Sequence, residues 1–341
     1  MWSDRGLGRR IARRLAAATG LHRAAKGLRD PGTGLTPEHV AWGYRLLLDR
    51  EPESPQVVAE KLAWCRTTRD LRADFLSSAE YRAKNRDLAL QNESCVVIKE
   101  LGGGLRLFVD LSDYVIGLAV VRDEYERSEL DFLRRTLPSG ATAVDLGANI
   151  GRFTVEMAGL VGPAGRVFAF EPVPRSAELL ARSIEENRFV DRVVLERAAV
   201  GDAGGTAAVA LLRDGLTSGG AYLAPSDRPP PPEHELHRVK MLRLDDYPLR
   251  RPVAFIKADV EGAEPRCMRG AADILAHDRP VILSEIHAAQ MRAVSSCAPA
   301  EFIAEMRERG YECRALENGK PAAVLDGGAL EPVQSVVFLP V

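Results

Sequence analysis

Residues 141–171 read ATAVDLGANIGRFTVEMAGLVGPAGRVFAFE, and this stretch decides how the rest of the chain is interpreted. A short apolar run ends on Asp145 and breaks at Gly147, and apolar residues with helical spacing follow Gly151. A turn rich in glycine then ends the helix, and a second apolar run ends on Glu171. The pattern predicts a strand, a glycine turn, a helix and a second strand, with an acid at the carboxyl end of each strand.

The glycine turn has the properties of a nucleotide-binding loop. Gly147 and Gly151 permit a positive φ and a close approach of backbone to ligand, and the N–H groups that begin the next helix point into the same crevice. Glu171 stands 20 residues after Gly151, where a carboxylate can accept hydrogen bonds from both hydroxyls of an adenosine ribose. Asp145 adds a negative charge that would repel a pyrophosphate and attract the ammonium of a methionyl group.

These motifs resemble a known enzyme family. The sequence D-x-G-x-N-x-G from Asp145, followed by Glu-Pro at Glu171, resembles motifs I and II of class I S-adenosylmethionine (SAM) methyltransferases. The ordered phrases DLGANIG, VFAFEPVP, KADVEGAE and ILSEIH resemble the FkbM-type family of these enzymes, over roughly residues 124–339. The resemblance implies SAM as the cofactor and a Rossmann-like domain. The residues expected to bind SAM are Asp145, Gly147, Asn149, Gly151, Glu171 and Ala199.

Two other nucleotide sites fit the turn less well. A dinucleotide-binding turn needs G-x-G-x-x-G, and Asn149 stands where the second glycine belongs. A P-loop needs Gly-Lys-Ser/Thr, which this turn lacks. The alternatives to a methyltransferase are therefore a nicotinamide oxidoreductase and a non-catalytic binding or scaffold protein that keeps the SAM fold.

Length and composition indicate about two domains. The 341 residues are 46% hydrophobic and 28% charged, as in ordinary globular proteins. No apolar stretch reaches the ~20 residues of a membrane-spanning helix. We expect a basic tail or amphipathic helix over residues 1–30, a helical module over 36–90 and a methyltransferase domain over 95–341.

The net charge of −2 does not favour a nucleic-acid partner. Five scattered cysteines without C-x-x-C spacing predict reduced thiols in a cytoplasmic compartment, and neither a zinc site nor disulfides. Residues 1–29 carry eight Lys or Arg and one acid, Asp4. Leu7, Ile11 and Leu15 fall on one stripe of a helix there. The segment is either a helix lying on the anionic inner face of a membrane or a solvated basic tail.

The segment 36–90 is expected to be helical. Thr36 and Pro37 are suited to start a helix, a second helix runs through Val57 to Trp64, and a third through residues 71–81. The phrases YRLLLDREP and FLSSAEY resemble a small helical module attached to glycosyltransferases and other enzymes of surface-glycan assembly. The alternative is a plain helical bundle that packs on the catalytic domain.

The remaining pattern alternates strands with helices. It predicts an α/β fold with a doubly wound, mostly parallel sheet and one late antiparallel strand pair. Residues 213–237, which include the Pro-rich loop 225–233, fit no regular element and suit either a specificity loop or a surface insertion. Strands are expected at 96–98, 105–109, 193–195 with a far end at 198–200, 239–244, 253–259, 280–287, 311–316 and 333–339. Helices are expected at 124–137, 174–187, 264–275 and 300–309.

Two of the later strands end on the residues expected to carry out the chemistry. Asp259 and Glu261 come at and just after the end of one strand, and Glu285 and His287 at the end of the next. Because ligands bind outside the carboxyl ends of parallel strands, these four catalytic candidates should converge. A histidine suits a general base near neutral pH, so His287 is assigned that role. Asp259 is expected to orient the methionyl group or an acceptor hydroxyl.

Three other interpretations of these residues remain open. Glu261 and Glu264 could pair with Lys257 and Arg266 and so brace the loop, and His287 could be an ordinary histidine at a strand end.

A divalent cation held by Asp259, Glu285 and His287 is the third interpretation, although our expectation is that no metal is used. The function expected from the sequence is SAM-dependent O-methylation of a hydroxyl, on a sugar of a glycan, a glycolipid or a related natural product.

Overall fold

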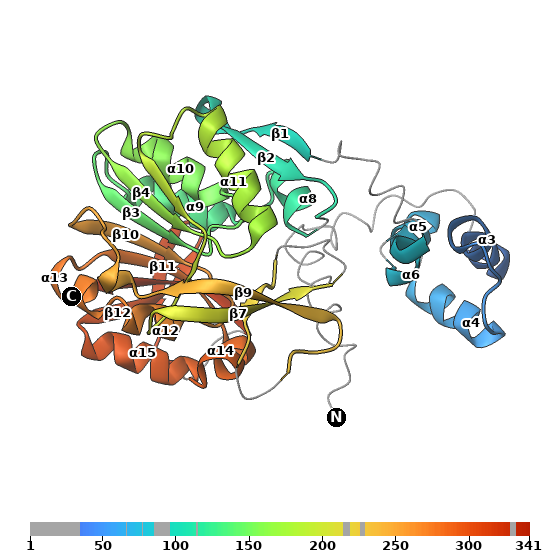
Figure 1. Cartoon of the computed structure of the whole chain (residues 1–341). Coiled ribbons are helices and arrows are strands. Elements are labelled where there is room, and N and C mark those ends of the chain that lie inside the picture. Colours follow the sequence, from blue (N-terminus) through green and yellow to red (C-terminus); the bar gives the residue numbers. More distant parts are fainter. Residues whose placement is uncertain are drawn as a thin grey trace. The chain divides into compact units, whose positions relative to one another are not determined.

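The computed structural model describes residues 35–65, 67–76, 78–84, 96–113, 115–213, 219–225, 229–327 and 332–341. The chain divides into two compact units, residues 1–93 and 94–341, each of which is described by itself (Figure 1). The basic segment 1–29 lies outside the described residues. In the part of the chain that is described, no helix is long and apolar enough to cross a membrane.

Four helices form the described part of the first unit. They are α3 (Pro37–Leu48), α4 (Pro55–Trp64), α5 (Thr68–Leu76) and α6 (Ala79–Lys84). Thr36 caps α3 as expected, because its side chain accepts the N–H of His39. The single helix expected over 71–81 is two helices, and Ser78 caps the second by accepting the N–H of Tyr81.

The core of this unit is small and partly aromatic. The rings of Tyr44 and Phe75 meet edge to face with centroids 4.9 Å apart, in a geometry that favours aromatic pairs. Val40, Leu48, Cys65 and Leu71 complete the buried cluster. The helical module is therefore held together by its own hydrophobic core.

An eight-stranded sheet organises the second unit. Its order is β13-β12-β14-β11-β10-β3-β4-β5, with β11, β10, β3, β4 and β5 parallel and the other three antiparallel to their neighbours. The α/β class and the mostly parallel doubly wound sheet are confirmed, with three antiparallel pairings where one was expected. The strands are β3 (Thr142–Leu146), β4 (Arg166–Phe170), β5 (Val193–Glu196), β10 (Val253–Ala258), β11 (Val281–His287), β12 (Tyr311–Glu317), β13 (Lys320–Val324) and β14 (Val333–Pro340).

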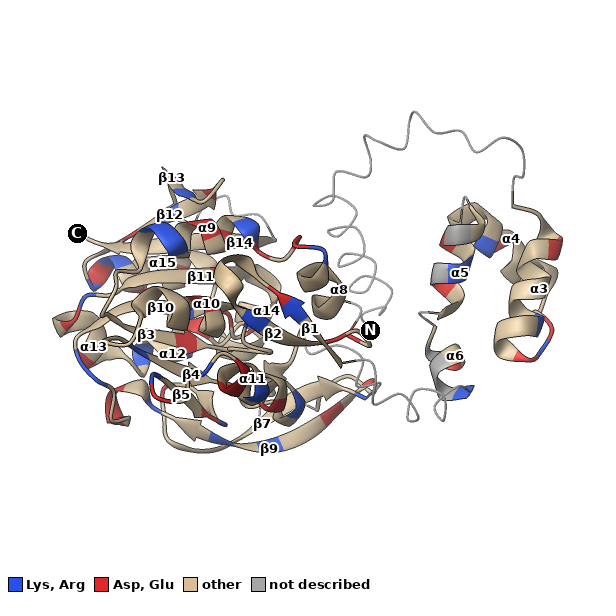
Figure 2. Ribbon diagram, turned by 90° about the horizontal axis from the view of Figure 1, so that it is seen from above, with Lys and Arg blue, Asp and Glu red and all other residues tan. Residues whose placement is uncertain are grey.

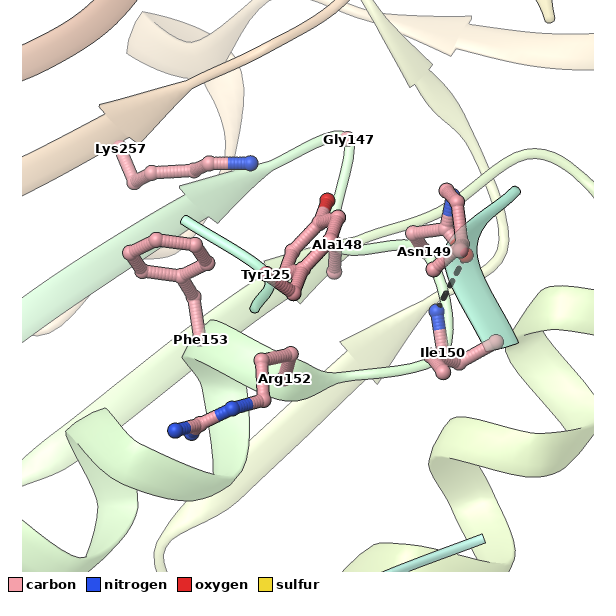
Figure 3. A pocket seen from close by; sticks show the side chains of 9 residues that line it. Tyr125, Gly147, Ala148, Asn149, Ile150, Arg152, Phe153 and Lys257 are labelled. Atoms are coloured by element: carbon pink, nitrogen blue, oxygen red, sulfur yellow. Dashed lines mark hydrogen bonds between the residues drawn. The ribbon is translucent and has the colours of Figure 1, made fainter. Parts of the chain in front are cut away.

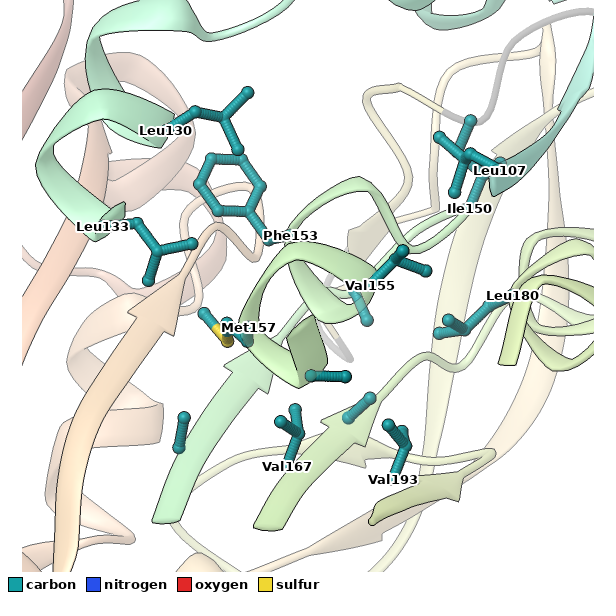
Figure 4. Close-up of a cluster of buried hydrophobic side chains, with 14 of the residues drawn as sticks. Leu107, Leu130, Leu133, Ile150, Phe153, Val155, Met157, Val167, Leu180 and Val193 are labelled. Carbon is teal, nitrogen blue, oxygen red and sulfur yellow. The ribbon is translucent and has the colours of Figure 1, made fainter. Parts of the chain in front are cut away.

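Two hydrophobic cores cover the two faces of this sheet. Successive side chains of a strand point to opposite faces, so Ala143 and Val167 join one core while Val144 and Phe168 join the other. Figure 4 shows the first of these cores, around Phe153 and Val167. On the first face pack β1 (Val96–Glu100), β2 (Arg106–Asp110), α8 (Ile116–Val121), α9 (Arg127–Thr136), α10 (Arg152–Val161) and α11 (Pro174–Glu186). On the second pack α12 (Glu264–Arg269), α13 (Ala272–His277), α14 (Ala288–Ser295) and α15 (Pro299–Glu308).

A smaller four-stranded sheet lies between the two halves in sequence. It contains β6 (Ala199–Val200), β7 (Gly205–Leu212), β8 (Tyr222–Leu223) and β9 (His234–Leu242), in the order β6-β9-β7-β8.

Two predictions were wrong at this sheet. Residues 198–200 do not extend the third strand, because the chain turns after Glu196, whose carbonyl accepts the N–H of Ala198. Residues 213–237 were expected to lack regular structure, yet β8 and the start of β9 lie there. Pairing with β7 imposes the extended conformation on the polar segment from His234.

Several boundaries also differ from expectation. The helix expected from residue 124 begins at Arg127, because Glu126 has a left-handed backbone with φ of 41°. The helix expected over 264–275 is interrupted between α12 and α13, where Ala271 leaves helical geometry with φ of −115°. The elements α8, α14 and β13 were not anticipated.

The order of the strands locates the ligand edge. From β3 the chain proceeds to β4 and β5 in one direction, whereas β10 and β11 extend the sheet in the other. In such sheets ligands bind outside the carboxyl ends of the strands at the point where the direction reverses. That point is between β3 and β10, where the loop after Leu146 and the loop after Ala258 meet.

Candidate active site

A buried acid–base pair lies at the reversal point. Asp145 of β3 and Lys257 of β10 are direct partners in the register of the two parallel strands, and they are 0% and 5% exposed. The Lys257 ammonium donates to Asp259 Oδ2 at 3.2 Å and lies 4.8 Å from the ring centroid of Phe153. Burial lowers the pKa of Lys257, but the carboxylates of Asp259, Glu126 and Asp145 outweigh burial and raise it, so the ammonium stays charged.

Asp145 holds an oxygen ready for a ligand. Its Oδ2 accepts from Thr154 Oγ1 at 2.5 Å, while its Oδ1 is buried without a hydrogen-bond partner among the described residues. Burial raises the pKa of this carboxyl, and the Lys257 ammonium and the Thr154 hydroxyl oppose that shift. A buried acceptor without a donor costs stability, so this oxygen points to a ligand that carries a donor group.

The turn after β3 depends on glycine for a reason the sequence did not show. Gly147 has φ of 75°, and a Cβ at this position would lie 2.0 Å from the backbone oxygen of Asp259. The close approach that Gly147 permits is therefore first of all to the loop after β10. Gly151, with φ of 95°, similarly lies against α11, where a Cβ would come within 2.3 Å of Leu180 Cδ1.

Asn149 and Glu171 fasten the turn. The N–H of Asn149, which has φ of 50°, donates to Glu171 Oε2 at 2.7 Å, and the N–H of Val173 donates to Glu171 Oε1 at 2.7 Å. Glu171 is 4% exposed, and burial raises its pKa to about 7 against these two hydrogen bonds. A solvated strand-end acid is thus ruled out for Glu171. Each carboxylate oxygen has a second lone pair with which it could accept a ribose hydroxyl.

We expect Glu171→Ala to weaken binding of S-adenosylhomocysteine by about 1.5–3 kcal/mol, the range for hydrogen bonds to a charged group. The same change should lower the melting temperature, because two buried N–H groups lose their acceptor. Calorimetric titration and thermal unfolding measure the two effects, with Glu178→Ala on the exposed face of α11 as the control. Equal cofactor affinity in Glu171→Ala and wild type would exclude Glu171 from the binding site.

Ala199 is placed near these loops without a demonstrated role. It is 6% exposed on β6 and packs in a cluster with Val173, Val209, Leu223 and Ala263. Val173 follows Glu171 closely and Ala263 belongs to the loop after β10. Contact between Ala199 and adenine stays a prediction.

The loop after β10 gathers three carboxyl groups. Asp259 has a side chain that is 21% exposed, and Glu261 accepts the N–H of Gly220 at 3.1 Å. Glu264 is 1% exposed and accepts the N–H groups of Val260 and Gly262 at 3.0 and 3.3 Å. Burial, reinforced by neighbouring carboxylates, raises the pKa of Glu261 to about 8 and that of Glu264 to about 7.

The expected bracing pairs are not those of the structure. Lys257 pairs with Asp259, and Arg266 pairs with Asp202 at 2.9 Å. Glu264 does brace the loop, but through backbone N–H groups. The predicted pairing of Glu261 and Glu264 with Lys257 and Arg266 is therefore wrong. The strand register places Lys257 opposite Asp145.

Glu285 and His287 end the next strand. Glu285 lies opposite Ser335 of β14, and His287 precedes α14, where its Nδ1 accepts the N–H of Gln290 at 3.2 Å. Among the described residues no three His, Cys, Asp or Glu side chains form a group that could hold a metal ion. Asp259, Glu285 and His287 are all described, so the divalent-cation interpretation is not supported by their positions.

A small cavity opens between these elements. It is lined by the turn after β3 and by Tyr125, Arg152, Phe153 and Lys257, and in Figure 3 Tyr125 lies between Lys257 and Asn149. The sequence offered a signal for Lys257, since a lone charge inside the apolar run of a buried strand is rare. It offered none for Tyr125, which lies outside the recognised motifs.

Comparison with known families identifies the domain. Residues 145–313 match the model of the methyltransferase FkbM domain. This part of the chain is an FkbM methyltransferase domain. The comparison with curated proteins found no match to the sequence.

Solved structures similar to this chain include other methyltransferases. Methyltransferase FkbM from Methylobacillus flagellatus KT has 15% identity, covers 87% of this chain and 58% of its own, and gives a TM-score of 0.39. A SAM-dependent O-methyltransferase from Thermotoga maritima has 13% identity and a TM-score of 0.39, and the alignment covers 72% of this chain and 77% of that protein. Precorrin-6y C5,15-methyltransferase from Geobacter metallireducens GS-15 has 18% identity and a TM-score of 0.37, and the alignment covers 65% of this chain and 88% of that protein. The family assignment rests on the sequence match.

The FkbM domain is a SAM-dependent methyltransferase, and its residues fit the cofactor. The buried Oδ1 of Asp145 and the carboxylate of Glu171 are suited to accept hydrogen bonds from ammonium and hydroxyl groups. The N–H groups at the start of α10 and the ammonium of Lys257 provide donors for a carboxylate. Both kinds of partner that a methionyl group needs are present at the same strand ends.

Proposed function

We propose that the FkbM domain methylates a hydroxyl group of a sugar or of a related polyhydroxylated acceptor. The observation that carries this proposal is the position of Asp259 and Glu261, which follow β10 directly beside the cofactor turn after β3. Carboxyl groups hydrogen-bond hydroxyls and accept their protons. An acceptor seated against these two residues is adjacent to the residues that fit the cofactor.

Bound SAM supplies an electrophilic methyl group on a sulfonium. Transfer of that methyl group to the acceptor oxygen would leave S-adenosylhomocysteine, and a base of the protein would take the hydroxyl proton. We assign the base to Asp259. Its side chain is 21% exposed, and Lys257 fixes the position of one carboxylate oxygen.

Glu261 is assigned a complementary role. With a pKa raised to about 8 by burial, it is protonated at neutral pH and can donate a hydrogen bond to an acceptor oxygen. The N–H of Gly220 and the side chain of Gln290 hold the Glu261 carboxyl. Two neighbouring carboxyl groups thus carry out different tasks, proton acceptance by Asp259 and orientation by Glu261.

His287 is a weaker candidate for the base than the sequence indicated. Its Nδ1 lone pair accepts the Gln290 N–H at the beginning of α14, which places the proton of the neutral ring on Nε2. A base needs an available lone pair directed at the acceptor. We therefore propose helix capping as the role of His287.

The charge around the site favours a neutral acceptor. Asp259 directly follows β10 and Glu285 lies near the end of β11, and their carboxylates would repel the phosphates of a nucleic acid. Elsewhere on the described ribbon Lys and Arg are interspersed with Asp and Glu (Figure 2). The resemblance of residues 36–90 to modules of glycan-assembly enzymes supports a sugar as the acceptor.

The raised pKa of Glu261 predicts a pH-dependent gain of stability in Glu261→Gln. Between about 4.5 and 8 the folded state keeps a proton that the unfolded state has lost, so this residue's contribution to stability falls as pH rises through that interval. Glutamine cannot ionise and can still accept the Gly220 N–H. We expect Glu261→Gln to melt at least about 2 °C higher than wild type at pH 8.5, where 1 kcal/mol corresponds to roughly 2–4 °C.

At pH 5 the same variant should melt close to wild type. Thermal unfolding at both pH values makes the comparison, and Glu185→Gln on the exposed side of α11 serves as the control. A gain of equal size at the two pH values would contradict ionisation of Glu261 as its cause.

A transfer assay tests the proposed function. The chain is incubated with SAM labelled in the methyl group and with lipid and glycan extracts of the native organism. We expect label in a sugar fraction, in a form that resists mild alkali as a methyl ether does. Label released by alkali would indicate a methyl ester and overturn hydroxyl transfer. Binding of S-adenosylhomocysteine without transfer to any hydroxylated acceptor would favour the non-catalytic scaffold.

A further inference from the structure

The turn formed by Tyr125 and Glu126 lies outside the matched FkbM region, which begins at residue 145. The structure nevertheless brings this turn to the ends of β3 and β10. Tyr125 lines the cavity together with the cofactor turn and Lys257. Its hydroxyl hydrogen-bonds the Glu126 carboxyl, whose pKa burial raises to about 7 while the nearby Lys257 ammonium opposes that shift.

The backbone of this turn is unusual. Glu126 has φ of 41°, in the left-handed region that a residue with a Cβ seldom occupies. Such conformations are unfavourable and persist where the surrounding structure requires them, often at ligand sites. Here the left-handed residue directly precedes α9, and Tyr125 before it lies beside the cavity, between Lys257 and Asn149 in the view of Figure 3.

The charges at the cavity match a zwitterion. Lys257 is a buried cation, and around it stand the carboxylates of Glu126, Asp145 and Asp259. The Oδ1 of Asp145 is buried and has no partner in the described structure. An α-amino acid carries an ammonium and a carboxylate on one carbon, so it needs a cation and anions within a few ångströms of each other.

We propose that Glu126 and Lys257 are cofactor-binding residues that hold the zwitterionic amino acid end of SAM, with Tyr125 as the wall that closes over it. The ammonium of the cofactor pairs with Glu126 and Asp145, and its carboxylate pairs with Lys257. This inference rests on the proposed function in so far as both require SAM at this site.

The experiment compares two probes that differ in the amino acid end. S-Adenosylhomocysteine carries it, and 5′-methylthioadenosine has the same adenosine and thioether without it. Affinities are measured by calorimetric titration of the full chain in wild type, Glu126→Gln and Lys257→Met. We expect each variant to bind S-adenosylhomocysteine about tenfold or more weakly, the loss of a charged hydrogen bond, and to bind 5′-methylthioadenosine within about twofold of wild type.

The control variant is Lys240→Met, which removes the ion pair between the exposed Lys240 of β9 and Glu196 of β5. It should leave both affinities unchanged. Tyr125→Phe retains the wall and removes the hydroxyl that contacts Glu126, so a smaller loss confined to S-adenosylhomocysteine is expected. Glu126→Gln preserves shape, which keeps the test valid if Lys257→Met does not fold.

Equal weakening of the two probes would overturn the inference, because the residues would then support the fold or the adenosine site. Unchanged binding of both probes in Glu126→Gln and Lys257→Met would overturn it as well. No acceptor takes part in these titrations. A failure of hydroxyl methylation in the transfer assay is therefore distinguishable from a failure of this assignment.

Discussion

Asp259→Asn should lower kcat by about 100-fold or more while leaving the affinity for S-adenosylhomocysteine within about threefold of wild type, as expected for removal of a general base. The asparagine keeps the size of the side chain and an oxygen that can accept from Lys257. It cannot take the proton of an acceptor hydroxyl at neutral pH. Turnover of the acceptor found in the transfer assay and calorimetric titration of the cofactor measure the two quantities.

One variant serves as a control for this prediction, and a second tests His287 as the alternative base. Asp191→Asn changes an exposed carboxylate that pairs with its neighbour Arg192 and should have no effect on kcat. His287→Ala should reduce kcat by less than about tenfold if His287 acts as a helix cap. Near-normal turnover in Asp259→Asn together with a large loss in His287→Ala would return the base to His287.

Gly147→Ala should destabilise the domain by about 3 kcal/mol. We also expect S-adenosylhomocysteine to raise the melting temperature of the wild type, as a ligand of the folded state does, and not that of this variant. The added Cβ would lie 2.0 Å from the backbone oxygen of Asp259, and a backbone atom cannot yield as the end of a flexible side chain can. The two strands must separate at the position where the cofactor turn meets the loop after β10. Thermal unfolding should show a decrease of roughly 6–12 °C.

Gly104→Ala is a matched control for this prediction. Gly104 has φ of 79°, close to the 75° of Gly147, but a Cβ there meets no atom within 4 Å. Both variants therefore carry the same backbone strain, about 1 kcal/mol, and Gly147→Ala alone adds a collision. Similar losses in the two variants would show that backbone strain, and not contact with Asp259, determines the role of Gly147.

Motifs at the strand ends revealed most of the fold. The run that ends on Asp145 and the run that ends on Glu171 are β3 and β4, and their pairing is parallel as a strand–helix–strand pattern requires. The strand that ends at Asp259 also lies next to β3. Local pattern and global topology agree here because buried parallel strands are continuous apolar runs that are easy to recognise.

Residues whose conformation depends on distant partners were the ones that the sequence could not place. The segment from His234 reads as polar loop, but pairing with β7 makes it strand. Lys257 was assigned to the wrong partners because register alone brings it opposite Asp145. Tyr125 lines the cavity through tertiary packing, and the sequence around it contains no spacing rule that would have indicated this position.

The candidate site was predicted in part for the same reason. Gly147, Asn149 and Glu171 do surround one turn, as their spacing indicated. Their hydrogen bonds and contacts are mainly to each other and to the loop after β10, which makes the turn a preformed structure. The sequence identifies which residues meet, whereas the structure shows how much of each residue's bonding capacity the protein itself uses.

The small sheet has a consequence for how new specificities could arise in this domain. The excursion leaves at Val200 and returns at Leu242, and these residues are neighbours in the β6–β9 pairing. Its two ends are therefore about 5 Å apart, the spacing of adjacent strands. A segment whose ends meet can be exchanged for another of different length without displacing the elements on either side. Residues 201–241 thus form a cassette that natural or laboratory recombination can replace while the β3–β10 pairing is kept, and each new segment sets anew the contact that Gly220 makes with Glu261.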